Sequence, residues 1–365
     1  MATFCLVGSV PDHVEITVPD YIDYYKGKTI LVTGGAGAIG SNLCQRLGEA
    51  GARMVIILDN LYSSYMWNIP VLPNILFVKG DITNDIDLKR VFTEKPDVVF
   101  HLAAFFANQN SIDYPERDLH VNGTGSLKLL EYATLSRISR FVYASSGCSI
   151  YGSAAPLPLT EEFMSMNLSS PYQITKMLGE LYCNFYYNHF ELPVVKARFF
   201  NSYGPGEVPG QYRNVIPNFL YWGLKGETLP ITGTGEETRD FTYVGDLVDG
   251  LLRAGYYESA IGEEFNLASG VETRIVDLAN RVVAATGGKS KVTIASRRKW
   301  DTKSRLLASV DKARKLIGYE PKVSFDEGFT QTIAWFRDKW NLIERDAAFT
   351  PGMSSAVKDR FKEKS

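Results

Sequence analysis

The chain has 365 residues, of which 45% are hydrophobic, and a formal net charge of −2. This length and composition are typical of a folded soluble protein with two domains, or one large domain with a subdomain. Acidic and basic residues are interspersed, so no electrostatic field of one sign favours nucleic acid or an anionic membrane surface as a partner. No apolar run reaches about 18 residues, so no membrane span is predicted.

The four cysteines, Cys5, Cys44, Cys148 and Cys183, show neither CxxC spacing nor a neighbouring histidine cluster. A metal site and a disulfide framework are therefore not expected, and a reducing cytoplasm suits the chain. The N-terminal stretch is apolar but carries no basic segment, so no export signal is predicted.

After a leader over residues 1–26, strand-like apolar runs alternate with helix-like segments. The runs are residues 30–33, 54–58, 75–78, 98–102, 141–145 and 194–199. This alternation predicts βαβ units, and runs that are apolar on both faces are typical of parallel strands covered by helices on both sides. We expect an α/β fold with a doubly wound parallel sheet of the Rossmann type, which binds its ligand at the carboxyl ends of the strands.

The first predicted strand is followed by three glycines at intervals of three, Gly34, Gly37 and Gly40, and then by a predicted helix over 41–49. In a strand-to-helix turn, missing side chains let backbone N–H groups approach a pyrophosphate. Asp59 ends the next strand, where a carboxylate accepts hydrogen bonds from the adenosine ribose and repels a 2′-phosphate. The sequence therefore predicts a dinucleotide site that favours NAD over NADP.

The later part of the chain is richer in glycine, proline and short strands. We expect a smaller C-terminal lobe formed by residues 204–239 with 270–345, while residues 240–269 rejoin the NAD-binding domain of residues 27–203. Residues 346–365 are polar and are predicted to form a solvated tail.

Tyr172 and Lys176 stand four residues apart in the segment 171–190, which has a helical pattern with Pro171 at its start. A free tyrosine has a pKa of about 10, but a nearby ammonium and the positive nicotinamide ring both favour the phenolate. The pair therefore suits a base assisted by a lysine, with a chance match on a solvated face as the alternative. Serine hydroxyls at 145–149 end a neighbouring strand, at the edge where the nicotinamide is expected.

Together these features resemble the extended short-chain dehydrogenase/reductase family, and within it the nucleotide-sugar epimerases, dehydratases and decarboxylases of the UDP-glucose 4-epimerase type. The similarity extends over about residues 27–340 and includes the segments 59–61, 80–82, 101–104, 121–124, 198–206 and 238–241. The resemblance implies that NAD is bound by Gly34, Gly37, Ala38, Ile39, Gly40, Asp59, Asn60, Asp81, Ile82, Leu102, Ala103, Ala104, Asn122, Tyr172 and Lys176.

The resemblance also implies a nucleotide-diphosphate sugar as substrate, held by Ser111, Asn201, Arg239 and Arg305. Arg305 is the weaker arginine candidate, because the charged stretch 297–305 also suits an ordinary solvated surface. A homodimer is expected through helices around 122–132 and 171–190, and His101 is expected to be structural or cofactor-adjacent.

The sequence departs from the family at the reacting end of the site. Gly147 stands where epimerases have a serine or threonine that binds the reacting hydroxyl, so this role is expected to pass to Ser149, to Ser146 or to water. Cys148 and Ser149 replace the acid and base that dehydratases use, and neither is a carboxyl group. We expect an NAD-dependent nucleotide-sugar 4-epimerase; the alternatives are a related enzyme that releases a 4-keto sugar and a non-catalytic NAD- or nucleotide-sugar-binding regulator.

Overall fold

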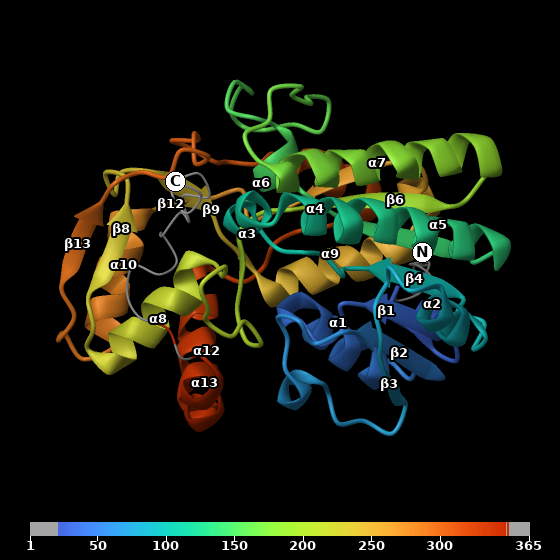
Figure 1. The fold of residues 1–365 in the computed structure, drawn as a ribbon, viewed down its shortest axis with the longest axis horizontal. Helices are drawn as coiled ribbons and strands as arrows, with labels where there is room; N and C mark the ends of the chain where they lie inside the picture. The colour runs from blue at the N-terminus through green and yellow to red at the C-terminus, as the bar shows by residue number, and fades with distance from the viewer. Residues whose placement is uncertain (1–20, 348, 350–365) are drawn as a thin grey trace, which may run out of the picture.

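A seven-stranded sheet forms the larger part of the protein. The computed structural model describes residues 21–347 and residue 349 (Figure 1). The strand order is β11 (Glu264–Leu267), β6 (Val194–Phe199), β5 (Arg140–Ser146), β4 (Val98–His101), β1 (Thr29–Thr33), β2 (Met54–Asp59) and β3 (Ile75–Lys79). Every neighbouring pair in this sheet is parallel, which confirms the predicted doubly wound α/β fold.

Successive side chains of the strands enter two different cores. In β1, Ile30 and Val32 belong to one hydrophobic core and Leu31 to the other. The first core includes side chains of α1 (Ala38–Glu49) and α9 (Val244–Tyr256), and the second includes those of α2 (Asp85–Phe92), α5 (Ser126–Leu135) and α7 (Pro171–Phe190). Helices thus cover both faces, which explains why the strands carry apolar residues on both faces.

A second region lies beside the sheet, at the left of Figure 1, and has its own hydrophobic core. It contains α8 (Val215–Lys225), α10 (Ile275–Ala285), α12 (Phe325–Asp338) and α13 (Trp340–Asp346), with β8 (Leu229–Thr232) parallel to β13 (Val292–Ala295). Two short pairs connect the regions: β7 (Ser202–Tyr203) with β10 (Thr242–Tyr243), and β9 (Thr238–Asp240) with β12 (Glu272–Arg274).

Short helices complete the chain. They are η1 (Asp23–Tyr25), η2 (Met66–Asn68), α3 (Asn108–Asp113), α4 (Pro115–Asp118), the π-helical η3 (Leu119–Gly125), α6 (Gly147–Ile150), η4 (Glu258–Ala260) and α11 (Asp311–Ile317). Although α11 falls within the stretch assigned to the C-terminal lobe, it contacts β11 and α9 of the sheet region. The domain boundaries stay a prediction.

The ends of the chain fall mostly outside the described residues, including most of the predicted leader and tail. The end of the leader packs on the core: Tyr25 is fully buried, and its hydroxyl donates to the Leu252 carbonyl at 2.5 Å. Within the described residues, no helix has the length and apolar character needed to cross a membrane.

Helix α7 is fixed to the sheet by polar contacts as well as by its apolar face. The helix begins at Pro171, where the Ser170 hydroxyl caps it by accepting the Gln173 N–H at 3.3 Å. Farther along, Glu180 forms a buried ion pair with Arg198 of β6, with N–O distances of 2.9 and 2.8 Å. The cap sets where the helix begins, and the ion pair holds one face of the helix against β6.

Candidate active site

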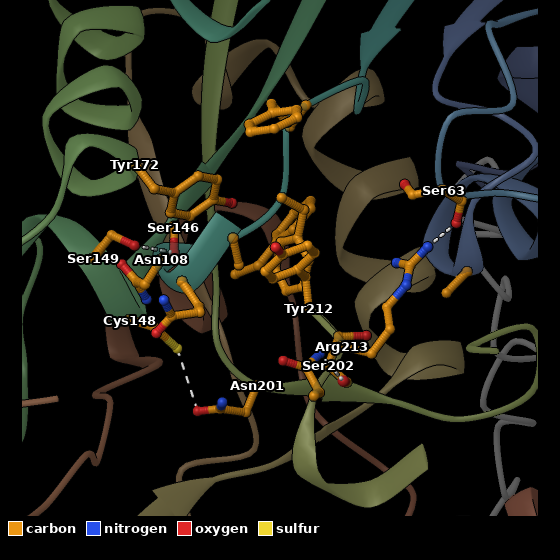
Figure 2. Close-up of a pocket in the computed structure, with 18 of the residues that line it drawn as sticks. Ser63, Asn108, Ser146, Cys148, Ser149, Tyr172, Asn201, Ser202, Tyr212 and Arg213 are labelled. Atoms are coloured by element: carbon orange, nitrogen blue, oxygen red, sulfur yellow. Dashed lines mark hydrogen bonds between the residues drawn. The ribbon is translucent and has the colours of Figure 1, made fainter. Parts of the chain in front are cut away.

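A deep pocket lies at the carboxyl ends of the sheet strands, between the sheet and the second region (Figure 2). Most of the predicted site residues line it: Gly34, Gly37, Ala38, Ile39, Gly40, Asp59, Asn60, Asp81, Ile82, Leu102, Ala103, Ala104, Ser146, Ser149, Tyr172, Lys176, Asn201 and Arg239. The topology thus brings residues more than two hundred positions apart to one edge of the sheet, as expected for a doubly wound fold.

The turn after β1 forms a cradle that only glycine can build. Gly34 has φ +72°, and a Cβ atom there would come within 2.7 Å of the Ala103 backbone nitrogen. A Cβ atom at Gly37 would meet the Gly34 carbonyl oxygen at 3.2 Å and no other described group within 4 Å. The turn is therefore closed against the β4 loop on one side and accessible to a ligand at Gly37, directly before α1.

The Asp59 carboxylate is held in place at the end of β2. One oxygen accepts the Ala36 N–H at 3.0 Å, and the other accepts the Leu61 N–H at 2.9 Å and the Ser64 hydroxyl at 2.8 Å. Because it lines the pocket beside the glycine turn, this carboxylate suits the ribose of a dinucleotide.

Tyr172 and Lys176 lie together in the pocket on α7. The Lys176 ammonium donates to the Ala144 carbonyl of β5 at 2.9 Å and lies 5.6 Å from the centre of the Tyr172 ring. Burial raises the pKa of Tyr172 above its usual range, and Asp118 and Cys148 raise it further. Burial lowers the pKa of Lys176 to about 8, against the opposing effect of Asp118.

The sequence predicted that the Lys176 ammonium and the positive nicotinamide ring together favour the Tyr172 phenolate, whereas in the protein alone the pKa of Tyr172 is raised. In the protein alone, burial outweighs any help from the ammonium, because a phenolate loses more hydration than a neutral phenol when both are buried. The effect of the nicotinamide ring on the pKa of Tyr172 stays a prediction.

Two serine hydroxyls lie beside Tyr172, as Figure 2 shows. Ser149 on α6 donates to the Ser146 hydroxyl at the end of β5 at 2.9 Å. Next to them the Cys148 thiol donates to the Asn201 side-chain oxygen at 3.3 Å. The pocket thus presents a phenol, two hydroxyls, a thiol and an amide to the same space.

Arg239 lines the pocket and is paired with Asp301 at 2.9 Å. The pair can still present guanidinium N–H groups to a phosphate, since an arginine has five donors in a planar fork.

Three predicted site residues do not line the pocket. Ser111 accepts the Tyr172 N–H at 3.0 Å, and the Asn122 side chain accepts the Phe105 N–H at 2.7 Å. Both are buried and brace the backbone around the site. Arg305 is exposed and pairs with Glu272.

His101 is also buried in the structure, with one ring nitrogen 2.8 Å from the Thr33 hydroxyl and the other 2.9 Å from the Ser126 hydroxyl. Burial lowers its pKa to about 3, so it stays neutral near neutral pH.

Known proteins share this sequence pattern and fold. A model of the NAD dependent epimerase/dehydratase family matches residues 30–268. A UDP-glucose 4-epimerase from Mycolicibacterium smegmatis is 37% identical over 313 residues, covering 85% of this chain and 98% of that protein. The chain belongs to the NAD-dependent epimerase/dehydratase family.

Solved structures of this family agree in fold. The epimerase Mth375 from Methanothermobacter thermautotrophicus is 57% identical, with a TM-score of 0.89 and coverage of 90% of this chain and 98% of that one. The WbmF enzyme from Bordetella bronchiseptica, in complex with NAD+ and UDP, is 36% identical, with a TM-score of 0.76 and coverage of 88% and 96%. NAD is therefore the cofactor, and the glycine cradle and the Asp59 carboxylate fit it.

The departure of this family member at Gly147 has a packing cause. A Cβ atom at Gly147 would lie 2.0 Å from Cε2 of Phe200. The Phe200 ring therefore occupies the space that a serine or threonine side chain would need, while Ser146 and Ser149, on either side of Gly147, line the pocket.

Sequence reasoning missed the polar residues that the second region contributes. Arg298, Trp300 and Lys303 line the pocket, within the charged stretch that also suited a solvated surface. The Trp300 indole N–H donates to Gln109 of α3 at 2.8 Å, and the Lys303 ammonium donates to the Cys148 carbonyl at 2.7 Å. The sequence signal that pointed to a partly buried segment was a tryptophan between basic residues, which is unusual in a wholly solvated stretch.

We expect Asp59→Ala to weaken NAD binding to the apoprotein by about 1.5–3 kcal/mol, the range for a lost hydrogen bond to a charged group. This corresponds to roughly a 10- to 150-fold higher Kd, measurable by calorimetry. Glu94→Ala, at an exposed position outside the pocket, is the control. Tighter binding of NADP than of NAD by the unaltered protein would contradict the assigned role of Asp59.

Proposed function

We propose that this protein is a nucleotide-sugar 4-epimerase that oxidises the sugar transiently at C4. One observation carries the proposal: Tyr172 and Lys176 line the same pocket as Ser146 and Ser149. Beside them Cys148 provides a thiol and not a carboxyl group. This set can remove and return a hydroxyl proton, but positions 148 and 149 provide no carboxyl acid or base for eliminating water.

The residues have separate tasks in this mechanism. Bound NAD supplies the hydride acceptor and, in the oxidised form, a positive ring that favours the Tyr172 phenolate. Tyr172 takes the proton of the C4 hydroxyl while Ser149 or Ser146 steadies the oxygen. Asn201 and Arg239 would hold the diphosphate while the sugar turns in the site, and Tyr172 would return the proton to the C4 oxygen on the opposite face of the sugar.

We infer that the nucleotide is UDP. The related epimerase from Mycolicibacterium smegmatis is named for UDP-glucose, and the WbmF structure contains UDP, which supports this inference. The same oxidation is shared by enzymes that release a 4-keto sugar, and the altered hydroxyl arrangement at Gly147 favours that alternative as the second candidate. The two differ in whether hydride returns to the sugar.

We further propose a homodimer through α7. Ile174, Leu181 and Phe185 are 55%, 53% and 48% exposed and, at spacings of seven and four, lie on one face of this helix. An exposed apolar helix face of this kind is typical of an interface, and a second copy of the chain offers the same face in return.

The epimerase proposal predicts interconversion of C4 epimers when the holoenzyme is incubated with UDP-sugars, followed by proton NMR. Tyr172→Phe is expected to lower kcat by about 10²- to 10⁴-fold, the usual contribution of a general base. Tyr187→Phe, on the exposed side of the same helix, is the matched control. Stoichiometric NADH and a free keto sugar would replace the epimerase with the second candidate.

The serine pair can be resolved by comparing Ser149→Ala with Ser146→Ala in single-turnover hydride transfer. We expect Ser149→Ala to slow the step by about 10- to 1000-fold, since one oriented hydrogen bond in a dry site contributes on this scale. A larger loss in Ser146→Ala would assign the role to Ser146, and equal rates in all three proteins would mean that neither hydroxyl binds the reacting oxygen.

The dimer proposal predicts twice the monomer mass in light scattering at micromolar concentration. Phe185→Asp is expected to shift the protein toward the monomer, because it buries an unpaired charge in the interface. Ile86→Asp, an equally apolar but distant exposed position on α2, is the control. A monomeric mass for the unaltered protein would refute the dimer.

A further inference from the structure

Lys303 brings a positive charge to the reacting end of the pocket. Its ammonium donates to the carbonyl oxygen of Cys148 at 2.7 Å. Cys148 directly precedes Ser149, and its side chain is near enough to Tyr172 to influence the titration of the phenol. Lys303 therefore lies close to the groups that the mechanism places around C4 of the sugar.

Among the described residues no acid forms an ion pair with Lys303, although Asp301 is close enough to raise its pKa. The nearby Asp301 accepts two hydrogen bonds from Arg239, at 2.9 and 3.2 Å, and no ion pair within 4 Å joins Lys303 to an acid. The ammonium has three N–H groups, of which the Cys148 carbonyl takes one. Burial lowers the pKa of Lys303 to about 8, so holding the charge here has a desolvation cost.

The diphosphate end of the substrate has other cations available. Arg239 and Arg298 both line the pocket, and the Arg298 Nε atom is buried without a hydrogen-bond partner among the described residues. Guanidinium groups suit phosphate oxygens because of their planar fork. Lys303, which donates to the backbone of Cys148 next to Ser149, is thus better placed for a group on the sugar than for the pyrophosphate.

We propose that the sugar is a hexuronate, and that Lys303 binds its C6 carboxylate. The proposal rests on the proposed function, which places C4 at Tyr172. C5 is the ring carbon next to C4, so its substituent lies next to the reacting hydroxyl, whereas a C2 substituent lies across the ring. A carboxylate at C6 would form charge-assisted hydrogen bonds with the two remaining N–H groups, whereas a neutral CH2OH group would leave these N–H groups without a charged acceptor.

Lys303 is then a specificity residue that takes no part in proton or hydride transfer. The carboxylate stays covalently unchanged, and its oxygens accept hydrogen bonds from the ammonium throughout the turnover. The neighbouring Lys299 carries the same charge but is exposed and does not line the pocket, so it provides a matched control.

The test is calorimetric titration of the NAD holoenzyme with UDP-glucuronate, UDP-galacturonate, UDP-glucose and UDP-galactose. We expect the uronates to bind at least tenfold more tightly than the neutral sugars. In Lys303→Met this ratio is expected to fall to near one, while Lys299→Met keeps it and Lys303→Arg keeps most of it. Thermal unfolding of each variant, compared with the unaltered protein, shows whether the fold is intact.

Two results would overturn the proposal. The first is equal or tighter binding of the neutral sugars by the unaltered protein. The second is an equal loss of affinity for all four ligands in Lys303→Met, which would place Lys303 at the diphosphate. NMR of the same mixtures separates this proposal from the proposed function. Lys303-dependent binding of uronates without inversion at C4 would refute the epimerase alone, and inversion of neutral sugars independent of Lys303 would refute the hexuronate alone.

Discussion

The position of α7 against β5 and β6 is the constraint on which the site depends. Two of the contacts that hold it are the buried ion pair between Glu180 and Arg198 and the hydrogen bond from Lys176 to the Ala144 carbonyl. Both partners of the ion pair are 2% exposed, so removing one would leave an uncompensated charge at a cost of about 3–5 kcal/mol. Arg198 also donates to the Tyr151 hydroxyl at 3.0 Å and so extends the same anchor to the end of α6. A rotation of α7 would separate Tyr172 from the serines.

Burial of this helix face determines the electrostatics of the site as well as its geometry. The same desolvation that raises the pKa of Tyr172 lowers that of Lys176, because each shift favours the neutral form. In the protein alone, both shifts therefore disfavour the charged phenolate–ammonium pair. Under the proposed mechanism, the positive ring that oxidised NAD would bring close to Tyr172 would favour the phenolate, so proton removal by Tyr172 would depend on bound NAD.

Segments of the second region reach across the pocket and bond to the NAD-binding side. Trp300 donates to Gln109, and its carbonyl accepts the Ser169 hydroxyl at 2.9 Å, while the Tyr212 hydroxyl donates to Asp113 at 2.9 Å. Arg213 bonds to the Ser63 carbonyl on the other side, as Figure 2 shows. Such contacts limit access of water, which is what a mechanism with a reactive 4-keto sugar requires.

The sequence determined the parts of the protein that depend on local spacing. Strand and helix periodicity predicted the parallel sheet, and the glycines with Asp59 predicted the NAD site, because each of these signals lies within about twenty residues of chain. The spacing of Tyr172 and Lys176 likewise predicted that they share a helix face. The tertiary structure decided what depends on contacts between distant segments: Phe200 filling the space at Gly147, Ser111 and Asn122 serving as braces, and Lys303 rather than Arg305 facing the pocket. These outcomes follow from side-chain packing between elements far apart in the chain, and no local pattern encodes which of several neighbouring charges a fold will turn inward.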